Sequence, residues 1–391
     1  MTKPILLTVN RVGFLGGVER IIVNSCVAAA DAGFRPVIAC PPGGDLARTA
    51  QEAGIEVAGL RLDRGQATTS PLQLYRLAGS VYRGRGEVLA LARELNASLI
   101  HVHHPMSAIQ AGSAAHLAQL PVLLHAHETL PIGALYRLAM RQIRHLPQLC
   151  LGVSKASCDM LCDVGMPADR VRLLYNAVDA RFFEAVTPAD DFAAAGGGAS
   201  GPHVGLFGVL EPRKGHEGFL AAARQVLARH PAATFWIVGG QSFADNAAYV
   251  ATLHRLAEAE GLAGHVRFTG FRADVPNLMA GMDVVVLAST GFESLPTVLI
   301  EACALGRAVV ATDIGGVREI VADGRTGLVV PPRDDAGLAA AILRALSPEG
   351  AVMAAAARES ARRRFGPARF AHELVQHYET LLRHSVMKRA A

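Results

Sequence analysis

One stretch of the sequence constrains the fold more than any other, and it runs from Met282 to Gly316 as MDVVVLASTGFESLPTVLIEACALGRAVVATDIGG. Short apolar runs at Asp283–Leu287 and Ala308–Thr312 are typical of buried strands. Between them, a loop leads into a helix that we expect over Thr297–Ala304. The pattern therefore predicts a strand–helix–strand unit, and such units build parallel sheets.

Two carboxylates stand eight residues apart at this expected helix, with Glu293 before it and Glu301 about two turns into it. The first turn of a helix exposes backbone N–H groups and the positive end of the helix dipole, and both attract phosphate. Here these groups belong to Leu295 through Val298, and Pro296 is tolerated because an early helical position needs no donor. We therefore expect a phosphate between two carboxylates that accept hydrogen bonds from hydroxyl groups on either side.

Length and composition indicate an α/β protein of two domains. The chain has 391 residues, which exceeds one ordinary domain and fits two of roughly 150 to 200 residues each. Its aromatic content of 5% argues against a platform for stacking bases, so we expect no nucleic-acid partner. The sequence has no apolar run of about 18 residues and no leading signal segment, and we expect a cytoplasmic protein. Its six cysteines form no C-x-x-C pair and are expected to be buried.

A glycine-rich loop follows the first expected strand. It contains Gly13, Gly16 and Gly17 and precedes a helix that we expect over Val18–Ala30. Its order is G-x-x-G-G rather than G-x-G-x-x-G, and the next strand, Arg35–Cys40, ends without the acidic residue that a ribose would need. The pattern argues against NAD. The residues alone leave open whether this loop contacts a ligand or only makes a tight turn.

Histidines gather at the ends of two expected strands, SLIHVHHP and PVLLHAHE. Strand alternation places His101 with His103, and His125 with His127, on a common face. Two interpretations stay open. These residues form a metal site, although no characteristic ligand spacing fixes one, or His101 and His125 pack in the core with satisfied ring nitrogens.

The composition shifts at Glu184–Gly201, EAVTPADDFAAAGGGASG, which is poor in large apolar residues and is expected to be a linker. Beyond it, a strand from His203 runs into a loop, Gly208–Gly215, that carries Arg213 and Lys214. Adjacent basic residues there can contact two phosphate oxygens through charge-assisted hydrogen bonds. The alternative is a solvated Arg–Lys pair.

The central stretch resembles a known family. Glu293 and Glu301, followed by Ala302, Gly306, Val309–Thr312 and Gly315-Gly316, look like the donor-site signature of retaining glycosyltransferases of family four, which have the GT-B fold. The resemblance implies two Rossmann-like, doubly wound parallel-sheet domains that face a cleft. These are an N-terminal acceptor-side domain at 1–183 completed by a C-terminal helix at 367–391, a linker at 184–201, and a donor-binding domain at 202–366.

The resemblance also implies roles for single residues. Arg213 and Lys214 would bind the donor diphosphate, Glu293 the sugar hydroxyls, Glu301 the ribose, and His127 the sugar from the side of the first domain. The implied loop near the acceptor and the donor phosphate contains Gly16 and Gly17, and the further donor-binding positions are Gly208, Arg272, Ser294, Leu295, Pro296, Thr297 and Val298. In one departure, many members have Arg directly after the first Gly of the basic loop, where this chain has Val209.

The implied reaction is transfer of a hexosyl-type group from a nucleoside diphosphate sugar to an acceptor hydroxyl with retention of anomeric configuration. We expect it to serve bacterial-type glycan, glycolipid, glycoconjugate or polysaccharide biosynthesis. No cofactor or metal is expected, since the chain has no Asp-x-Asp pair and the basic loop replaces the cation. The alternatives are a catalytically silent GT-B subunit that binds a nucleotide sugar, and a GT-B sugar-nucleotide epimerase.

The first half of the chain is basic. Residues 1–183 contain 18 Lys+Arg against 13 Asp+Glu, and Arg137, Arg141 and Arg144 fall on one face of an expected helix. Such a face suits an anionic membrane surface, and a solvated face is the alternative. We therefore expect a carbohydrate or lipid-linked acceptor, with peripheral contact at the cytoplasmic face of the membrane as a hypothesis.

Overall fold

The computed structural model describes residues 3–11, 13, 16–62, 71–127, 140–141, 144–189, 201–240 and 246–390. The chain folds into two compact units. The first consists of Met1–Asn176 with Ala368–Ala391, and the second of Ala177–Pro367. Relative to the domains expected at 1–183 and 202–366, residues 177–183 join the second unit. Most of the expected linker, residues 190–200, lies outside the described residues.

The first unit contains a sheet in which all described pairings are parallel. Its described strands have the order β3-β2-β1-β4-β5-β6-β7. The step from β1 to β4 reverses the winding direction, which makes the sheet doubly wound. The strands are β1 (Ile5–Val9), β2 (Arg35–Cys40), β3 (Glu56–Gly59), β4 (Leu99–Val102), β5 (Val122–Ala126), β6 (Leu149–Gly152) and β7 (Val171–Leu173).

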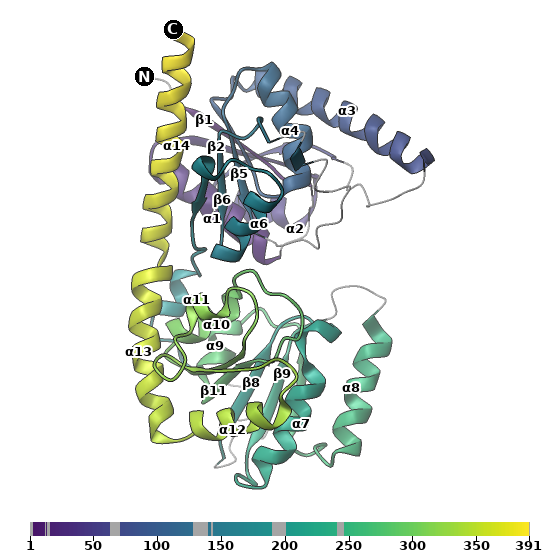
Figure 1. Cartoon of the computed structure of the whole chain (residues 1–391), viewed down its shortest axis with the longest axis vertical. Coiled ribbons are helices and arrows are strands. Elements are labelled where there is room, and N and C mark those ends of the chain that lie inside the picture. Colours follow the sequence, from purple (N-terminus) through teal and green to yellow (C-terminus); the bar gives the residue numbers. More distant parts are fainter. Residues whose placement is uncertain are drawn as a thin grey trace. The chain divides into compact units, whose positions relative to one another are not determined.

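Helices cover both faces of this sheet (Figure 1). Strand alternation sends Leu124 into the core beneath α3 and α4, and Ile38 into the smaller core beneath α1 and α2. The last helix, α14, lies alongside the sheet, where Tyr378 is fully buried against Phe34 and His101. The helices are α1 (Gly17–Asp31), α2 (Asp45–Glu52), α3 (Pro71–Glu94), α4 (Pro105–Leu117), α6 (Lys155–Asp163) and α14 (Pro367–Ala390).

The second unit repeats this plan. Its described strands pair in parallel in the order β10-β9-β8-β11-β12-β13. They are β8 (His203–Phe207), β9 (Thr234–Val238), β10 (Val266–Gly270), β11 (Val284–Leu287), β12 (Ala308–Thr312) and β13 (Leu328–Val330). The helices are α7 (His216–Leu227), α8 (Ala247–Ala259), α9 (Val275–Ala280), α10 (Thr297–Ala304), α11 (Val317–Ile320), α12 (Asp335–Ala345) and α13 (Pro348–Phe365), with a short 3-10 turn η4 (Pro212–Lys214). Both strands and the helix expected between 282 and 316 are present.

The structure confirms the predicted fold class and corrects some elements. The apolar residues that follow Glu319 in the sequence predict a strand–turn–strand, but Val317–Ile320 forms a helical turn, because Val317 and Ile320 bury one face at helical spacing. Strand β3 was not predicted, since this edge strand has no fully buried residue. Among the cysteines expected to be buried, Cys162 is exposed and Cys158 half-buried.

Within the described part of the chain, no single helix is long and apolar enough to cross a membrane. One bent pair, Asp335–Ala345 with Pro348–Ser385, passes that test by length and composition only.

Candidate functional site

The basic loop between β8 and α7 owes its shape to two glycines. Gly208 has φ +153° and Gly215 has φ +71°, conformations that side chains disfavour. A Cβ at Gly215 would lie 1.9 Å from the carbonyl oxygen of Ala288, so this loop packs backbone to backbone against the loop after β11. Between the two glycines, the turn η4 carries Arg213 and Lys214.

The carboxylate of Glu293 accepts hydrogen bonds from three side chains where these two loops meet. The Nζ of Lys214 donates to Oε1 at 2.5 Å, the Oγ of Ser289 donates at 2.9 Å, and Nη1 of Arg213 donates at 3.4 Å. The side chains of Lys214 and Glu293 are only 14% and 11% exposed, whereas that of Arg213 is 46% exposed and also binds Glu211. Lys214 and Glu293 therefore form a largely enclosed ion pair at the ends of two adjacent strands, β8 and β11.

The backbone around Glu293 is fixed from both sides. The N–H groups of Thr290 and Gly291 donate to the carbonyl of Arg213 at 2.8 and 3.2 Å, and the N–H of Gly316 donates to the carbonyl of Glu293 at 2.9 Å. Gly315 has φ +50°, and a Cβ there would lie 1.7 Å from the same carbonyl oxygen. The Gly-Gly loop after β12 thus holds the residue that the sequence assigned to the donor sugar.

Helix α10 begins where the sequence predicted. Pro296 is its N-cap, and no side chain caps the first turn. Leu295 and Pro296 are buried, while Ser294, Thr297 and Val298 are half-buried. Glu301 lies in the second turn and is half-buried. The N-cap residue therefore occupies none of the first-turn N–H groups with its side chain, as an anion site at this helix end requires.

Glycines also crowd the ends of the neighbouring strands. Gly239 follows β9 with φ +157°, and a Cβ there would lie 1.8 Å from the carbonyl oxygen of Gly208. Arg272, one of the expected donor-binding residues, binds Asp274 through Nε and Nη2 at 2.8 and 2.7 Å. These hydrogen bonds lower the pKa of Asp274. Asp274 was not among the predicted residues, although an R-x-D spacing ahead of a helix is a signal in the sequence that could have found it.

Gly16 and Gly17 belong to the first unit, at the start of α1. Gly16 is the N-cap, and its N–H donates to the carboxylate of Glu19 at 3.1 Å. A Cβ at Gly17 would meet nothing within 4 Å, so packing does not require glycine there. Glu19 was not among the predicted residues, and its position three residues after the cap is the signal that could have found it.

His127 follows β5 and is buried. Its Nε2 lies 3.0 Å from Nδ1 of His103, and the two rings stack with centroids 5.3 Å apart. Burial and then the nearby His104 lower the pKa of His127 to about 3, so its ring is neutral at pH 7. A neutral ring can donate or accept a hydrogen bond without carrying charge.

His101 and His125 do not match the expected packing with satisfied nitrogens. Nδ1 of His101 lies 2.9 Å from the hydroxyl of Tyr378. His125 has no hydrogen-bond partner for either ring nitrogen among the described residues, so that interpretation is wrong for His125. Of the predicted basic face, Arg141 and Arg144 are exposed, and Arg137 lies outside the described residues.

Two protein-family models match the chain. One is described as Glycosyltransferase Family 4 and matches residues 15–182, and the other is described as Glycosyl transferases group 1 and matches residues 201–348. The chain belongs to the family-4-type glycosyltransferases. The model that matches residues 201–348 includes the positions of Arg213, Lys214, Glu293 and Glu301.

Curated relatives of this glycosyltransferase include the alpha-D-kanosaminyltransferase of Streptomyces kanamyceticus, 32% identical over 245 residues. That alignment covers 61% of this chain and 60% of the relative. A phosphatidyl-myo-inositol mannosyltransferase of Mycolicibacterium smegmatis is 36% identical over 175 residues, or 44% of this chain and 43% of the relative. The alignments thus span less than two thirds of these relatives.

Solved structures extend the likeness to the whole fold. The crystal structure of Anabaena HepE in complex with UDP has a TM-score of 0.83 at 25% identity and covers 96% of this chain and 100% of HepE. HepE in complex with UDP-glucose has a TM-score of 0.81 at 26% identity, with 96% and 99% covered. These structural neighbours have the GT-B architecture expected from the sequence.

Proposed function

We propose that this protein transfers a sugar from a nucleoside diphosphate sugar to an acceptor hydroxyl with retention of configuration. The observation that carries the proposal is the enclosed Lys214–Glu293 pair beside the uncapped start of α10. It combines fixed positive charge for a phosphate with a carboxylate for sugar hydroxyls. HepE, which is similar in fold and sequence, binds UDP and UDP-glucose, so a uridine diphosphate sugar is the first donor to test.

The chemistry requires charge stabilisation at the diphosphate. The bond between the anomeric carbon and the phosphate oxygen breaks, and its electron pair goes to the diphosphate. The acceptor oxygen then bonds to the same face of that carbon, and its proton passes to the departing phosphate oxygen. In this proposal, Arg213, Lys214 and the first-turn N–H groups of α10, all in the second unit, stabilise this negative charge.

Donor binding exchanges the partners of the ion pair. Without donor, Lys214 donates to Glu293. With donor, Lys214 contacts a phosphate oxygen, and the carboxylate of Glu293 accepts from sugar hydroxyls while Ser289 still holds it. Because the ammonium and guanidinium groups supply the positive charge, we propose that the diphosphate needs no divalent cation. Glu301 is proposed to bind the ribose, Arg272 and Gly208 to border the nucleotide, and His127 to contact the sugar.

The acceptor side of the proposal rests on the first unit. A carbohydrate or lipid-linked acceptor in glycan or glycoconjugate synthesis is proposed, with Gly16 and Gly17 near it. Arg141 and Arg144 are exposed cations suited to an anionic membrane surface. Flotation with anionic vesicles should fall when both become Ala, and unchanged flotation would remove the membrane part of the proposal. A peripheral position at the cytoplasmic membrane face is part of that same hypothesis.

The test is a thermal-shift and calorimetric screen against UDP, GDP, ADP and UDP-glucose, with EDTA present throughout. A ligand that binds only the folded protein raises Tm by mass action. We expect one diphosphate series to bind without metal, Glu301→Ala to abolish that binding, and Glu258→Ala, an exposed carboxylate on α8, to leave it unchanged. Binding by none of these diphosphates would overturn the donor site.

Turnover then separates the enzyme from its alternatives. A silent binding subunit saturates without consuming the donor, and an epimerase converts the donor sugar without releasing the diphosphate. We expect release of the diphosphate and a glycosyl product whose anomeric configuration, read by NMR, equals that of the donor. An inverted product would contradict the retaining mechanism while leaving the donor site intact.

A further inference from the structure

Four histidines of the first unit form one buried array, of which only His127 is also proposed to contact the donor sugar. His101 is in β4, His103 directly follows that strand, and His125 and His127 occupy the same positions in and after β5. Their exposed fractions are 0%, 2%, 0% and 7%. The register pairs His101 with Leu123 in parallel strands, so all four side chains share one face of the sheet. That is the face on which Tyr378 packs.

Some ring nitrogens of this array have no hydrogen-bond partner among the described residues. Nδ1 of His101 is paired with the hydroxyl of Tyr378, and Nδ1 of His103 with Nε2 of His127. Within the described residues, Nε2 of His101, Nε2 of His103 and both nitrogens of His125 are buried without a partner. A buried polar atom without a partner typically costs about 1–3 kcal/mol. Because several such atoms lie close together, a bound ligand that pairs with them would remove this cost.

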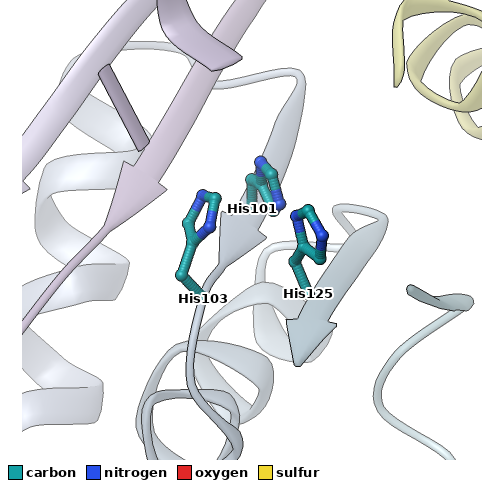
Figure 2. A group of neighbouring side chains, drawn as sticks. All are labelled: His101, His103 and His125. Carbon is teal, nitrogen blue, oxygen red and sulfur yellow. The ribbon is translucent and has the colours of Figure 1, made fainter. Parts of the chain in front are cut away.

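The imidazoles of three of these histidines lie close enough to share a ligand. Figure 2 shows the imidazoles of His101, His103 and His125 gathered over the ends of two strands. One ligand nitrogen from each lies within 4.8 Å of the others. Among the described residues, no other group of three His, Cys, Asp or Glu side chains meets that condition.

We propose that His101, His103 and His125 bind one divalent transition-metal ion of the kind that prefers imidazole, with Zn²⁺ as the reference ion. Imidazole nitrogens suit Zn²⁺, Cu²⁺ and Ni²⁺ rather than Mg²⁺ or Ca²⁺. In a tetrahedral zinc site with bonds of about 2.1 Å, ligand nitrogens lie about 3.4 Å apart. Because the ligand nitrogens lie within 4.8 Å of one another, the three rings need to close by at most about 1.4 Å when the ion enters.

The protonation state and the outer contacts fit this role. A metal ligand must be neutral, and burial, followed by the neighbouring histidines, lowers the pKa of His101, His103 and His125 well below 6.5. A metal-bound imidazole also needs a partner for its other nitrogen, and Tyr378 and His127 already occupy those positions for His101 and His103. The fourth position is left to a water molecule, which ionises near pH 7 on zinc and reduces the enclosed charge.

The ion would link three segments. It joins β4 to β5 and, through His101 and Tyr378, reaches the C-terminal helix α14. It lies in the first unit and is independent of the donor diphosphate, for which no metal is proposed.

The test uses the full-length chain without a histidine tag, stripped with a chelator and then titrated with ZnCl₂. We expect one tightly held zinc per chain by elemental analysis, a higher Tm, and Co²⁺ absorption bands typical of tetrahedral coordination. His125→Gln should lower zinc affinity at least about 100-fold, and Tyr378→Phe, an outer contact, about 10- to 100-fold. His125 is the informative position because its substitution breaks no described hydrogen bond.

His116→Gln is the matched control. His116 is exposed on α4, and its ring centroid lies 6.2 Å from that of exposed His145, which makes this pair the obvious adventitious site. Zinc retained by His125→Gln and lost by His116→Gln would overturn the proposal, as would no zinc on the wild type. If His125→Gln fails to fold, X-ray absorption of the wild-type protein with zinc bound can count the imidazole nitrogens around the ion. A count below three would contradict the proposed site.

Discussion

At the scale of single residues, the decisive contact is between Lys214 and Glu293. The two residues are 79 positions apart, and their side chains meet at 2.5 Å because adjacent strands end at the same edge of the sheet. Sequence motifs assigned each residue to the donor separately. Their pairing with each other could not be predicted, since it depends on the geometry of two loops in the absence of ligand.

Replacing Lys214 by Ala should lower kcat by about 10²- to 10³-fold, because it removes preplaced positive charge where negative charge develops. Lys214→Arg should recover part of the rate. Initial rates at saturating donor measure the effect. Arg224→Ala removes an exposed cation of α7 that pairs with Glu260 and should leave the rate unchanged. An equal loss in both Ala variants would mean that general charge, not this site, matters.

The buried histidines make stability depend on pH. In the folded protein burial lowers the pKa values of His101, His103, His125 and His127, so the unfolded chain binds more protons as the pH falls below about 6.5. Stability is therefore complete above about pH 6.5 and is lost as the pH falls. His127, whose pKa in the folded protein is about 3, alone costs about 2 kcal/mol at pH 5.

Urea unfolding in EDTA at pH 7.5 and pH 5 should show this loss of stability, and the slope with pH should shrink in His125→Gln but not in His116→Gln. Stability that does not change between these pH values would show that the array accepts protons in the folded state.

At the scale of elements, the turns after β8 and β12 decide where the site residues stand. Gly215 and Gly315 both have positive φ and leave no room for a Cβ against a neighbouring backbone oxygen. The sequence predicted loops at both places from their glycines. It did not predict α13, whose alanine-rich sequence gives little contrast between its faces, or β3, whose edge position gives no apolar run.

Gly315→Ala should destabilise the protein by about 2–4 kcal/mol, because a Cβ with φ +50° would lie 1.7 Å from the carbonyl oxygen of Glu293. Donor affinity should fall as well, since Glu293 must move. Gly264→Ala provides the control, as a Cβ there meets nothing within 4 Å. Chemical denaturation and donor titration measure both effects, and equal stability of the two variants would contradict the packing argument.

At the scale of the whole molecule, the sequence predicted two parallel-sheet domains with a C-terminal helix returning to the first, and the parallel sheets are confirmed. The βαβ pattern fixes this much because parallel strands need helical crossovers. The domain boundary at Asn176 could not be predicted from the sequence, because it depends on the packing of residues 177–183 and no shift in composition marks it.

Deleting residues 368–391 should unfold the first unit while the second still binds donor. The deletion removes Phe370, Leu374, Tyr378 and Leu381, which are all buried, and each such side chain contributes about 1.5–3 kcal/mol. Hydrogen exchange would show loss of protection confined to β1–β7. Protection that survives there would mean that α14 is dispensable.

The placement of α14 has a consequence for synthesis. The strands of the first unit are complete at Asn176, but the helix that covers their histidine face begins at Pro367, after the whole second unit. At about 5–20 residues per second, a ribosome needs roughly 10 to 40 s to make the 177–367 segment. For that interval the part of the face that α14 covers, including His101, stays open, so the first unit completes its packing only after the second unit has been made.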